Sequence, residues 1–453
     1  MCAVYNQIDR FKASVPAQPI EPHLYTNYSV KRGLRNENGT GVLVGLTRVG
    51  EVFSYYVDDG ERLPVDGKLF YRGIALTDLV HGFYDENRFG FEETAYLLIF
   101  GELPDAASLA QFETHLAQVR CLPNLFVEDM IFKSPSRDIM NKLARSILAL
   151  YAYDQMPDDI TIENVFRQSM ELLAKFPLLV AYAYMAKRHY IDGKSLFIHF
   201  PNETFNTAQN ILQLIRPDGE FSPLEAKILD LALVVHAEHG GGNNSTFTTR
   251  CVTSTGTDTY SAIASGICSL KGPQHGGAAG RAYHMMEDAK ATIRHWDNEA
   301  EVRDYLRALL RGEAYDRSGL VYGIGHAVYT LSDPRARLLS GYAKDLAKEK
   351  NRLAEYEFYR LFESLAPEVF DEVKQNGKIV CANVDFYSGF IYNMLGIPED
   401  LFTPIFATAR IAGWCAHRLE ELISCGRIIR PAYKNVQKRR SYTPFDQRQE
   451  DLS

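Results

Sequence analysis

Side chains that could carry acid–base chemistry occur in four separated segments, VVHAEHGGGN, GPQHGGAAG, GIGHAVYTLSDPR and NVDFYSG. The segments contain His239, His275, His326, Arg335 and Asp385, most of them next to glycines that allow a ligand close to the backbone. A carboxylate can remove a proton, a neutral imidazole can donate one, and a guanidinium binds anions. These residue types predict an acid–base enzyme that acts on an anionic substrate.

The element that should position the first histidines is a helix. Ser-Pro-Leu-Glu at 222–225 is a capping box with proline at the first helical position, which predicts that a helix begins there. Apolar residues follow at helical spacing, and the glycines at 240–242 end the pattern just after His236 and His239. We therefore expect both histidines at the C-terminal end of this helix.

A second helix is predicted from Thr403-Pro404 to Gly426, with Arg410 near its middle among alanines and a glycine. Small residues there permit close packing against a neighbouring helix. The apolar neighbours of Arg410 argue against an ordinary solvated arginine.

Strands are predicted only near the N-terminus. Residues 41–47, 51–57 and 68–73 have strand-like composition, and the stretch 58–67 reads as a turn-rich connection. The rest of the chain carries residues that mark the starts and ends of helices, so the sequence predicts a mainly α architecture with a small N-terminal sheet.

Composition excludes several classes of partner. The chain has 453 residues, 46% of them hydrophobic, which is enough for one large core or two unequal ones, and its net charge of −8 argues against nucleic acid or an anionic membrane. The longest apolar run, at 176–186, is too short to span a bilayer, and the N-terminus lacks a signal-peptide pattern. Seven cysteines without metal-type spacing fit reduced thiols, so we expect a cytoplasmic protein.

The motifs GPQHGG, GIGHAVYTLSDPRAR and NVDFYSG, in this order and separation, resemble the citrate synthase family. The resemblance runs from GKLFYRG at 67–73 to RIIRP at 427–431. It implies a helical homodimer whose subunits each have two domains. The large domain would comprise residues 1–276 and 388–453, and residues 277–387 would form a small domain that closes over the substrates.

The resemblance also implies roles for three catalytic residues. Asp385 would remove a proton from the methyl group of acetyl-CoA, a step that is far uphill for a carboxylate with a reference pKa of about 3.9. A donor at the thioester oxygen is therefore required, and His275, expected before a helix N-terminus, would be that neutral donor. His326 would polarise and protonate the ketone of oxaloacetate. Condensation and thioester hydrolysis would give citrate and CoA, the activity of an acyltransferase.

Oxaloacetate carries two carboxylates, which guanidinium groups bind bidentately. The resemblance assigns its binding to Arg335, Arg410 and Arg430, together with His239. Arg430 would reach into the site of the other subunit, which makes the homodimer part of the catalytic apparatus.

Several alternatives stay open at this point. Propionyl-CoA in place of acetyl-CoA would give 2-methylcitrate, and one methylene changes binding in an apolar pocket by only about 1–3 kcal/mol. A non-catalytic homologue that binds a dicarboxylate or CoA is a more remote reading. A metal hydrolase built on His236 and His239 lacks the usual ligand spacing, so no metal and no tightly bound cofactor are expected.

Two further features have no firm interpretation. Lys434, Lys438, Arg439 and Arg440 form a basic cluster that either meets CoA phosphates or is a solvated tail. Ala279 stands where the family commonly has asparagine, which predicts altered support of the His275 loop with the catalytic histidine retained.

Overall fold

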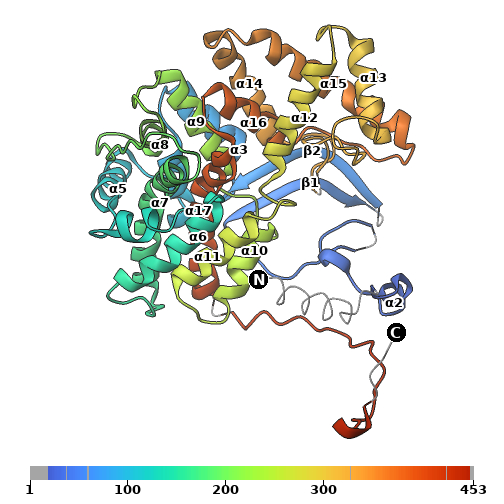
Figure 1. Ribbon diagram of the computed structural model, residues 1–453, viewed down its shortest axis with the longest axis horizontal. Coiled ribbons are helices and arrows are strands. Elements are labelled where there is room, and N and C mark those ends of the chain that lie inside the picture. The colour runs from blue at the N-terminus through green and yellow to red at the C-terminus, as the bar shows by residue number, and fades with distance from the viewer. Residues whose placement is uncertain (1–18, 37, 59–60, 327, 425, 449–453) are drawn as a thin grey trace.

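Helices make up most of the computed structural model, which describes residues 19–36, 38–58, 61–326, 328–424 and 426–448 (Figure 1). The longer helices are α3 (Leu76–Asp85), α4 (Phe91–Phe100), α5 (Ala106–Val119), α6 (Ile139–Leu150), α7 (Ile162–Tyr190), α8 (Thr207–Ile215), α9 (Pro223–His236), α10 (Asn244–Thr253), α11 (Thr259–Leu270), α12 (Ala278–Thr292), α13 (Glu299–Arg311), α14 (Pro334–Glu349), α15 (Leu353–Lys374), α16 (Val384–Met394) and α17 (Phe402–Ile423). Short helical turns are α2 (Pro22–Asn27), η1 (Arg32–Leu34), η2 (Val127–Phe132), η3 (Tyr151–Tyr153), η4 (Glu399–Leu401) and η5 (Phe445–Gln447). The predicted fold class, mainly α with a small N-terminal sheet, is confirmed.

The sheet has three antiparallel strands in the order β1 (Gly50–Asp58), β2 (Glu61–Tyr71) and β3 (Ile74–Ala75). The strands predicted at 51–57 and 68–73 are therefore confirmed in essence. The strand predicted at 41–47 is wrong, because this segment has only an isolated bridge between Arg35 and Gly41. Leu43 and Leu46 remain 84% and 85% exposed, so these apolar side chains cover no core surface of this chain.

The predicted turn at 58–67 is also mostly wrong, since β2 begins at Glu61. Pro64, which we took as part of a turn, lies opposite Tyr55 beside a shift in register between Phe53 and Tyr55. A local irregularity of this kind tolerates a residue without an N–H donor. The hairpin connection itself falls at 59–60, outside the described residues.

Helix α9 begins as the sequence predicts. The Ser222 hydroxyl accepts from the Glu225 amide at 3.1 Å, and the Ser222 amide donates to the Glu225 carboxylate at 2.8 Å, which completes the capping box. Beyond its first turn the helix is buried almost all round, as expected of a helix at the centre of a helical core. The helix ends at His236, so His239 lies three residues beyond the end of a rigid helix.

Helix α17 begins at Phe402, one residue before the predicted start, and ends three residues before Gly426. Its small residues do permit close packing. A Cβ atom added at Gly413 would lie 2.5 Å from the carbonyl oxygen of Ala237, just past the end of α9. The contact of the two helices therefore requires glycine at position 413.

The helices form two groups (Figure 1). Helices α12 to α16 pack mainly among themselves, through α12 with α16, α13 with α15, and α14 with both α15 and α16. Helices α4, α6, α7, α9, α10, α11 and α17 form the other group, and α9 contacts both α14 and α16. The predicted division into domains at 277–387 remains a prediction.

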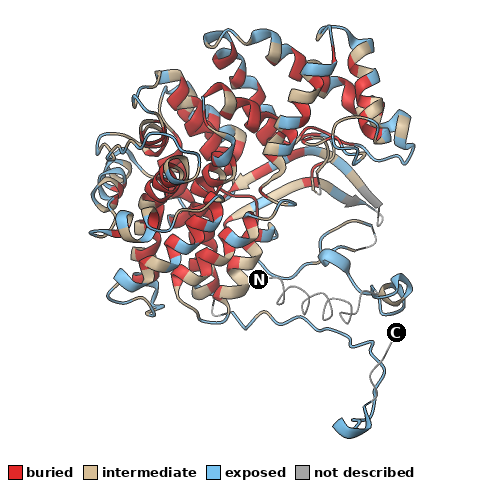
Figure 2. Ribbon diagram, viewed as in Figure 1, coloured by how far each residue is buried: buried red, intermediate tan, exposed pale blue. Residues whose placement is uncertain are grey.

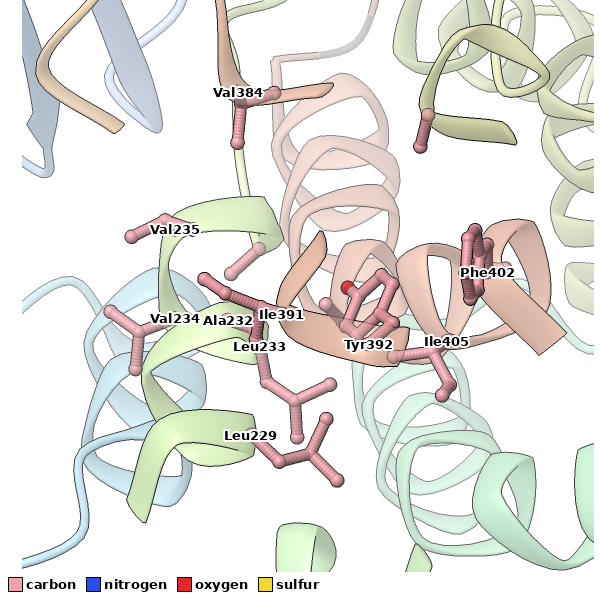
Figure 3. Packing of buried hydrophobic residues seen from close by; sticks show 14 of the residues in the cluster. Leu229, Ala232, Leu233, Val234, Val235, Val384, Ile391, Tyr392, Phe402 and Ile405 are labelled. Carbon is pink, nitrogen blue, oxygen red and sulfur yellow. The ribbon is translucent and has the colours of Figure 1, made fainter. Parts of the chain in front are cut away.

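Buried residues concentrate where these helices meet, whereas the N-terminal segment up to residue 46 and the chain after residue 426 are mainly exposed (Figure 2). Figure 3 shows side chains of α9, including Leu229 and Leu233, next to Ile391 and Tyr392 of α16 and Ile405 of α17. This apolar packing holds together three helices that carry or precede candidate site residues: α9 before His239, α16 with Asp385, and α17 with Arg410.

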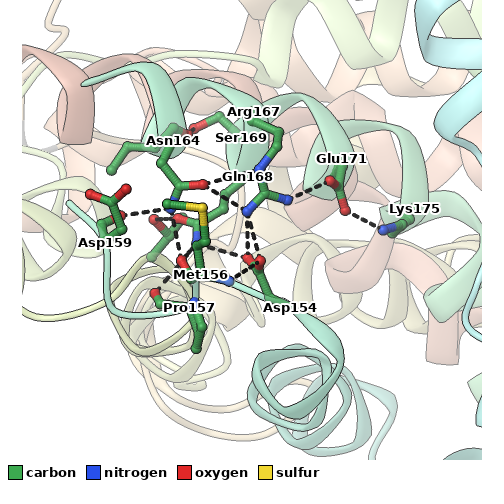
Figure 4. Close-up of polar contacts among 12 residues, drawn as sticks. Asp154, Met156, Pro157, Asp159, Asn164, Arg167, Gln168, Ser169, Glu171 and Lys175 are labelled. Carbon is green, nitrogen blue, oxygen red and sulfur yellow. Dashed lines mark hydrogen bonds and ion pairs between the residues drawn. The ribbon is translucent and has the colours of Figure 1, made fainter. Parts of the chain in front are cut away.

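A line of alternating charges fastens α7 to the loop before it (Figure 4). Arg167 donates to Asp154 at 2.7 and 2.9 Å and to Glu171 at 2.7 Å, and Glu171 in turn pairs with Lys175 at 2.6 Å.

Although α7 is long and includes the apolar run at 176–186, no helix among the described residues is both long and apolar enough to cross a membrane.

The close approach of β2 to the segment before α14 gives a testable prediction. The amide of Gly67 donates to the Ser332 hydroxyl at 3.1 Å, and a Cβ at Gly67 would lie 2.1 Å from the Ser332 carbonyl oxygen. Gly67→Ala should therefore force backbone apart and destabilise the protein by about 1–3 kcal/mol, measured by urea unfolding. The matched control is Gly82→Ala in α3, where the space is open and a gain of about 0.5–1 kcal/mol is expected. Equal stability of both variants would contradict this packing argument.

Candidate active site

Three of the predicted histidines line one cleft of about 990 Å³. His239 follows α9, His275 precedes α12, and His326 lies in the connection from α13 to α14. The walls include β1 residues and the glycines at 240–242. The structure thus brings together histidines that are up to 87 positions apart in the sequence, as the motifs predict.

His326 and Asp385 are joined by backbone pairing of their segments. Ile324 forms a bridge with Ala382, the Gly325 amide donates to the Cys381 carbonyl at 2.7 Å, and the Asn383 amide donates to the Gly323 carbonyl at 2.9 Å. Asn383 also caps α16, because its side chain accepts from the amide of Asp385 at 3.0 Å. One short ladder therefore places two candidate catalytic residues.

The ring of His326 is held in one tautomer. Its Nδ1 accepts from the amides of Val328 at 2.9 Å and Tyr329 at 3.1 Å, so in the neutral ring the proton must be on Nε2. Burial, reinforced by the charge of Arg335, lowers the pKa of His326 to about 4. The ring is therefore neutral near pH 7, with a hydrogen to donate from Nε2.

His275 has a similar environment. The loop leads into α12 as predicted, with the Gly276 amide donating to the Leu270 carbonyl at 2.9 Å and Thr403 donating to the Gly276 carbonyl at 2.8 Å. Burial and the charge of Arg410 lower the pKa of His275 to about 4. Its Nε2 is buried and has no hydrogen-bond partner among the described residues, so it is available to a ligand.

Asp385 lies in the first turn of α16 and is partly buried. Burial raises the pKa of its carboxyl to about 6, while the positive charges of Arg335 and Arg410 oppose a larger rise. A carboxylate with a raised pKa is a stronger base than an exposed one and is still ionised at pH 7.

Arg410 is fully buried, and only one of its nitrogens has a partner. Nε donates to the His236 carbonyl at 2.7 Å, whereas neither terminal nitrogen has a hydrogen-bond partner among the described residues. Burial lowers the pKa of Arg410 to about 10, which still leaves it charged. A buried guanidinium with two free nitrogens is suited to a carboxylate ligand.

Arg335 is also buried, but it is paired within the chain. Its Nε and one terminal nitrogen donate to Asp333 at 3.1 and 2.7 Å. His239 lies close by: its ring centroid is 5.4 Å from that of His326, and its Nε2 is buried without a partner among the described residues. Burial lowers the pKa of His239 well below its usual range.

Arg430 is not brought into this cleft. It is exposed in the extended segment after α17, which contacts the body of its own chain through the Ile429 amide and the Ser254 hydroxyl at 3.0 Å. Its predicted role in the site of a partner subunit remains a prediction.

The sequence reasoning missed Asp333 and the pairing of Glu238. Asp333 caps α14, accepting from the Arg335 amide at 2.9 Å, and accepts from the Val384 amide at 3.3 Å, so it ties α14 to α16. Asp before Pro at a helix start is a cap pattern that could have identified it. Glu238 is fully buried and pairs with His417 at 3.0 Å, which no local pattern indicates.

Two other features of the site can be located in the structure. Among the described residues, no group of three or more His, Cys, Asp or Glu side chains is placed to hold a metal ion. Ala279 is buried in α12, and a Cβ at Gly389 of α16 would lie 2.9 Å from its carbonyl oxygen. The two helices therefore approach closely beside the position where the family commonly has asparagine.

Three histidines line one cleft of this helical fold, and two buried arginines lie near enough to lower the pKa values of these histidines. Together with Asp385, whose pKa the same arginines affect, this set of side chains is typical of an acid–base enzyme for anionic substrates. A sequence profile described as "Citrate synthase, C-terminal domain" matches residues 38–432. The chain is 34% identical over 388 residues to a citrate synthase from Synechocystis, covering 84% of this chain and 89% of that protein. It is also 34% identical over 369 residues to a 2-methylcitrate synthase from Shewanella oneidensis, covering 80% and 87%.

The fold leads to the same family. The crystal structure of citrate synthase from Pyrobaculum aerophilum matches with a TM-score of 0.73 and 28% identity, covering 90% of this chain and 94% of that one. The chain therefore belongs to the citrate synthase family and is an acyltransferase of that type. The family assignment made from the motifs is confirmed.

The position of Asp333 gives a prediction about stability. Asp333→Asn keeps the shape of the side chain but leaves the buried Arg335 without its charged partner, so we expect a loss of about 3–5 kcal/mol in urea unfolding. The control is Asp345→Asn, whose partner Lys348 is exposed and whose loss should change stability by less than about 0.5 kcal/mol. A loss below 1 kcal/mol at position 333 would mean that Arg335 does not depend on this pair.

Proposed function

We propose that the enzyme condenses acetyl-CoA with oxaloacetate and water to give citrate and CoA. The observation that carries the proposal is one cleft lined by three histidines, two of which have pKa values of about 4. Asp385, Arg335 and Arg410 are not among the lining residues, but the charges of the two arginines affect the pKa values of these histidines and of Asp385. Family membership supports the same reaction.

The reaction begins at Asp385, whose carboxylate removes a proton from the methyl group of acetyl-CoA. As the proton leaves, negative charge develops on the thioester oxygen, and the neutral ring of His275 donates a hydrogen bond to it. Because an imidazole with a pKa near 4 is not protonated at pH 7, this donor stabilises the enol or enolate without protonating the base.

The second half of the reaction uses His326. Its Nε2 hydrogen polarises the ketone of oxaloacetate and moves to the new alkoxide as the enol carbon attacks. Water then hydrolyses the citryl thioester and releases CoA. In this scheme, the free terminal nitrogens of Arg410 bind one substrate carboxylate, with Arg335 and His239 close to the same substrate.

The site is proposed to be complete only in a homodimer. Arg430 is exposed on an extended segment that is separate from its own cleft, so it is available to a partner subunit. In the dimer it would bind the second carboxylate of oxaloacetate.

The alternative acyl donor is propionyl-CoA, because the chain is about as similar to a 2-methylcitrate synthase as to a citrate synthase. The decisive assay measures CoA release with oxaloacetate and either acetyl-CoA or propionyl-CoA, with a blank lacking oxaloacetate. The ratio of kcat/KM identifies the donor. Asp385→Asn, which keeps the shape of the base, is the matched control and should abolish release. No release by the folded wild-type dimer would favour a non-catalytic binding homologue.

The raised pKa of Asp385 predicts the pH dependence. The base must be ionised, so kcat/KM for the acyl donor should be level above pH 7 and fall tenfold per pH unit below about pH 6. His275 and His326 stay neutral until about pH 4 and should add no loss above that value. A profile that is flat from pH 7 to pH 5, measured in buffers of constant ionic strength, would exclude this carboxyl as the base.

Domain closure forms part of the proposal. Residues 277–387 would close over bound oxaloacetate and shield the reaction from water until condensation is complete. Oxaloacetate alone should slow amide hydrogen exchange within 277–387. Unchanged exchange at saturating oxaloacetate would contradict closure.

A further inference from the structure

A serine on strand β1 contacts the connection that carries His326. Ser54 is buried, with 1% of its surface exposed. Its hydroxyl donates to the carbonyl of Val328 at 2.8 Å, although the two residues are 274 positions apart in the sequence. Neither the motifs nor the steps of the proposed reaction give this serine a role.

Ser54 faces this connection at a point where β1 is irregular. The register of β1 with β2 shifts between Phe53 and Tyr55, and Ser54 has no opposite residue in that register. A shift of this kind changes the direction in which the side chain at the irregular position points. The irregularity therefore accounts for a buried hydroxyl that leaves the sheet and contacts a neighbouring loop.

The hydrogen bond from Ser54 acts on a peptide group that also contacts His326. The carbonyl of Val328 and the amide of Tyr329 belong to one peptide group, and in a trans peptide these two bonds lie in one plane and point in opposite directions. The Tyr329 amide donates to Nδ1 of His326 at 3.1 Å. Ser54 therefore holds one side of a rigid group whose other side contacts the imidazole.

The far end of the connection is attached to the same hairpin. The Gly67 amide donates to the Ser332 hydroxyl at 3.1 Å, and this hydroxyl donates to the carboxylate of Asp66 at 2.8 Å. These bonds do not involve Ser54. The loss of its hydroxyl should therefore leave the connection attached to the sheet and release only the peptide group next to His326.

We propose that Ser54 is a positioning residue that keeps His326 in the tautomer with its hydrogen on Nε2, an inference that rests on the proposed function. Hydrogen bonds in series polarise one another, so a donor at the Val328 carbonyl makes the amide on the other side of the peptide group a better donor. Two amide donors at Nδ1 require the ring proton on Nε2. When one of these donors turns away, the proton can move to Nδ1, and Nε2 then has no hydrogen for the ketone of oxaloacetate.

The kinetic test uses two substitutions of Ser54. Ser54→Ala removes the hydroxyl, and Ser54→Cys fills a similar space with a weak donor. Because one hydrogen bond is lost, kcat should fall about tenfold in the alanine variant, while the KM values for oxaloacetate and acetyl-CoA stay within about twofold. The cysteine variant should also lose rate, and it carries the test if the alanine variant does not fold. A cysteine variant as fast as the wild type would overturn the proposal, because only the volume of the side chain would then matter.

The matched control is Ser169→Ala in α7. Ser169 is also fully buried, and its hydroxyl donates to a backbone carbonyl, that of Val165, at 2.7 Å. It is not among the residues that line the cleft, so its loss should leave kcat within about twofold. An equal fall of kcat in Ser54→Ala and Ser169→Ala would overturn the proposal, and so would a raised KM for oxaloacetate in Ser54→Ala alone.

The tautomer of His326 separates this inference from the proposed function. Nitrogen NMR of protein labelled in its histidine rings distinguishes the two neutral tautomers, and His326→Gln identifies the signals of this ring. Near pH 7 and without substrates, the wild type should have the hydrogen on Nε2, whereas Ser54→Ala should also populate the other tautomer. If the wild-type protein releases no CoA, the condensation proposal fails, and these spectra still test Ser54. The same tautomer in both proteins would overturn the positioning role.

Discussion

The site depends on two guanidinium groups that are buried beside neutral imidazoles. Burial alone lowers the pKa of each histidine in the cleft, and the charges of Arg335 and Arg410 lower it further. The same two charges oppose the effect of burial on Asp385 and keep its pKa near 6. One arrangement therefore keeps the imidazoles neutral and the Asp385 carboxyl ionised at pH 7. The imidazoles must stay neutral while the carboxyl must stay ionised, and a partly dehydrated, positively charged surrounding meets both requirements.

Burying two cations is costly, and the chain compensates them differently. Arg335 has the carboxylate of Asp333, which also receives amides from the first turns of α14 and α16. Arg410 donates to one backbone carbonyl, feels the charge of Glu238, and has no hydrogen-bond partner among the described residues at its two terminal nitrogens, which are available to a ligand. The first arginine is thus part of the packing between α14 and α16, whereas the second keeps two nitrogens without a partner among the described residues. Arg410 is positioned where α17 packs against α9, because its Nε donates to the carbonyl of His236, the last residue of α9. Figure 3 shows the apolar side chains of α9, α16 and α17 that meet in this region.

The sequence could predict the elements whose signals are local. Neighbouring residues determine the capping box of α9, the loop before α12 and the mainly α fold. The motifs then identified the family. The predictions of a strand at 41–47 and of a turn at 58–67 were wrong, because strand formation depends on a partner strand that the local pattern does not specify. The contact of Asp333 with Val384 and the Glu238–His417 pair were missed for the same reason, because the partners are 51 and 179 positions apart, whereas the cap formed by Asp333 did have a local signal. Long-range polar contacts of this kind leave no periodicity in the sequence.

The distribution of positive charge suggests how the cleft divides its substrates. The cations inside the protein are fixed by burial, and of the two arginines Arg410 has terminal nitrogens without a partner among the described residues, which suits one carboxylate of a small anion. The chain carries exposed cations on its two extended ends, Arg35 before the first strand and Arg430 after the last long helix. The buried arginines therefore lie with the candidate catalytic residues in the body of the protein, whereas these two exposed arginines lie on segments outside it.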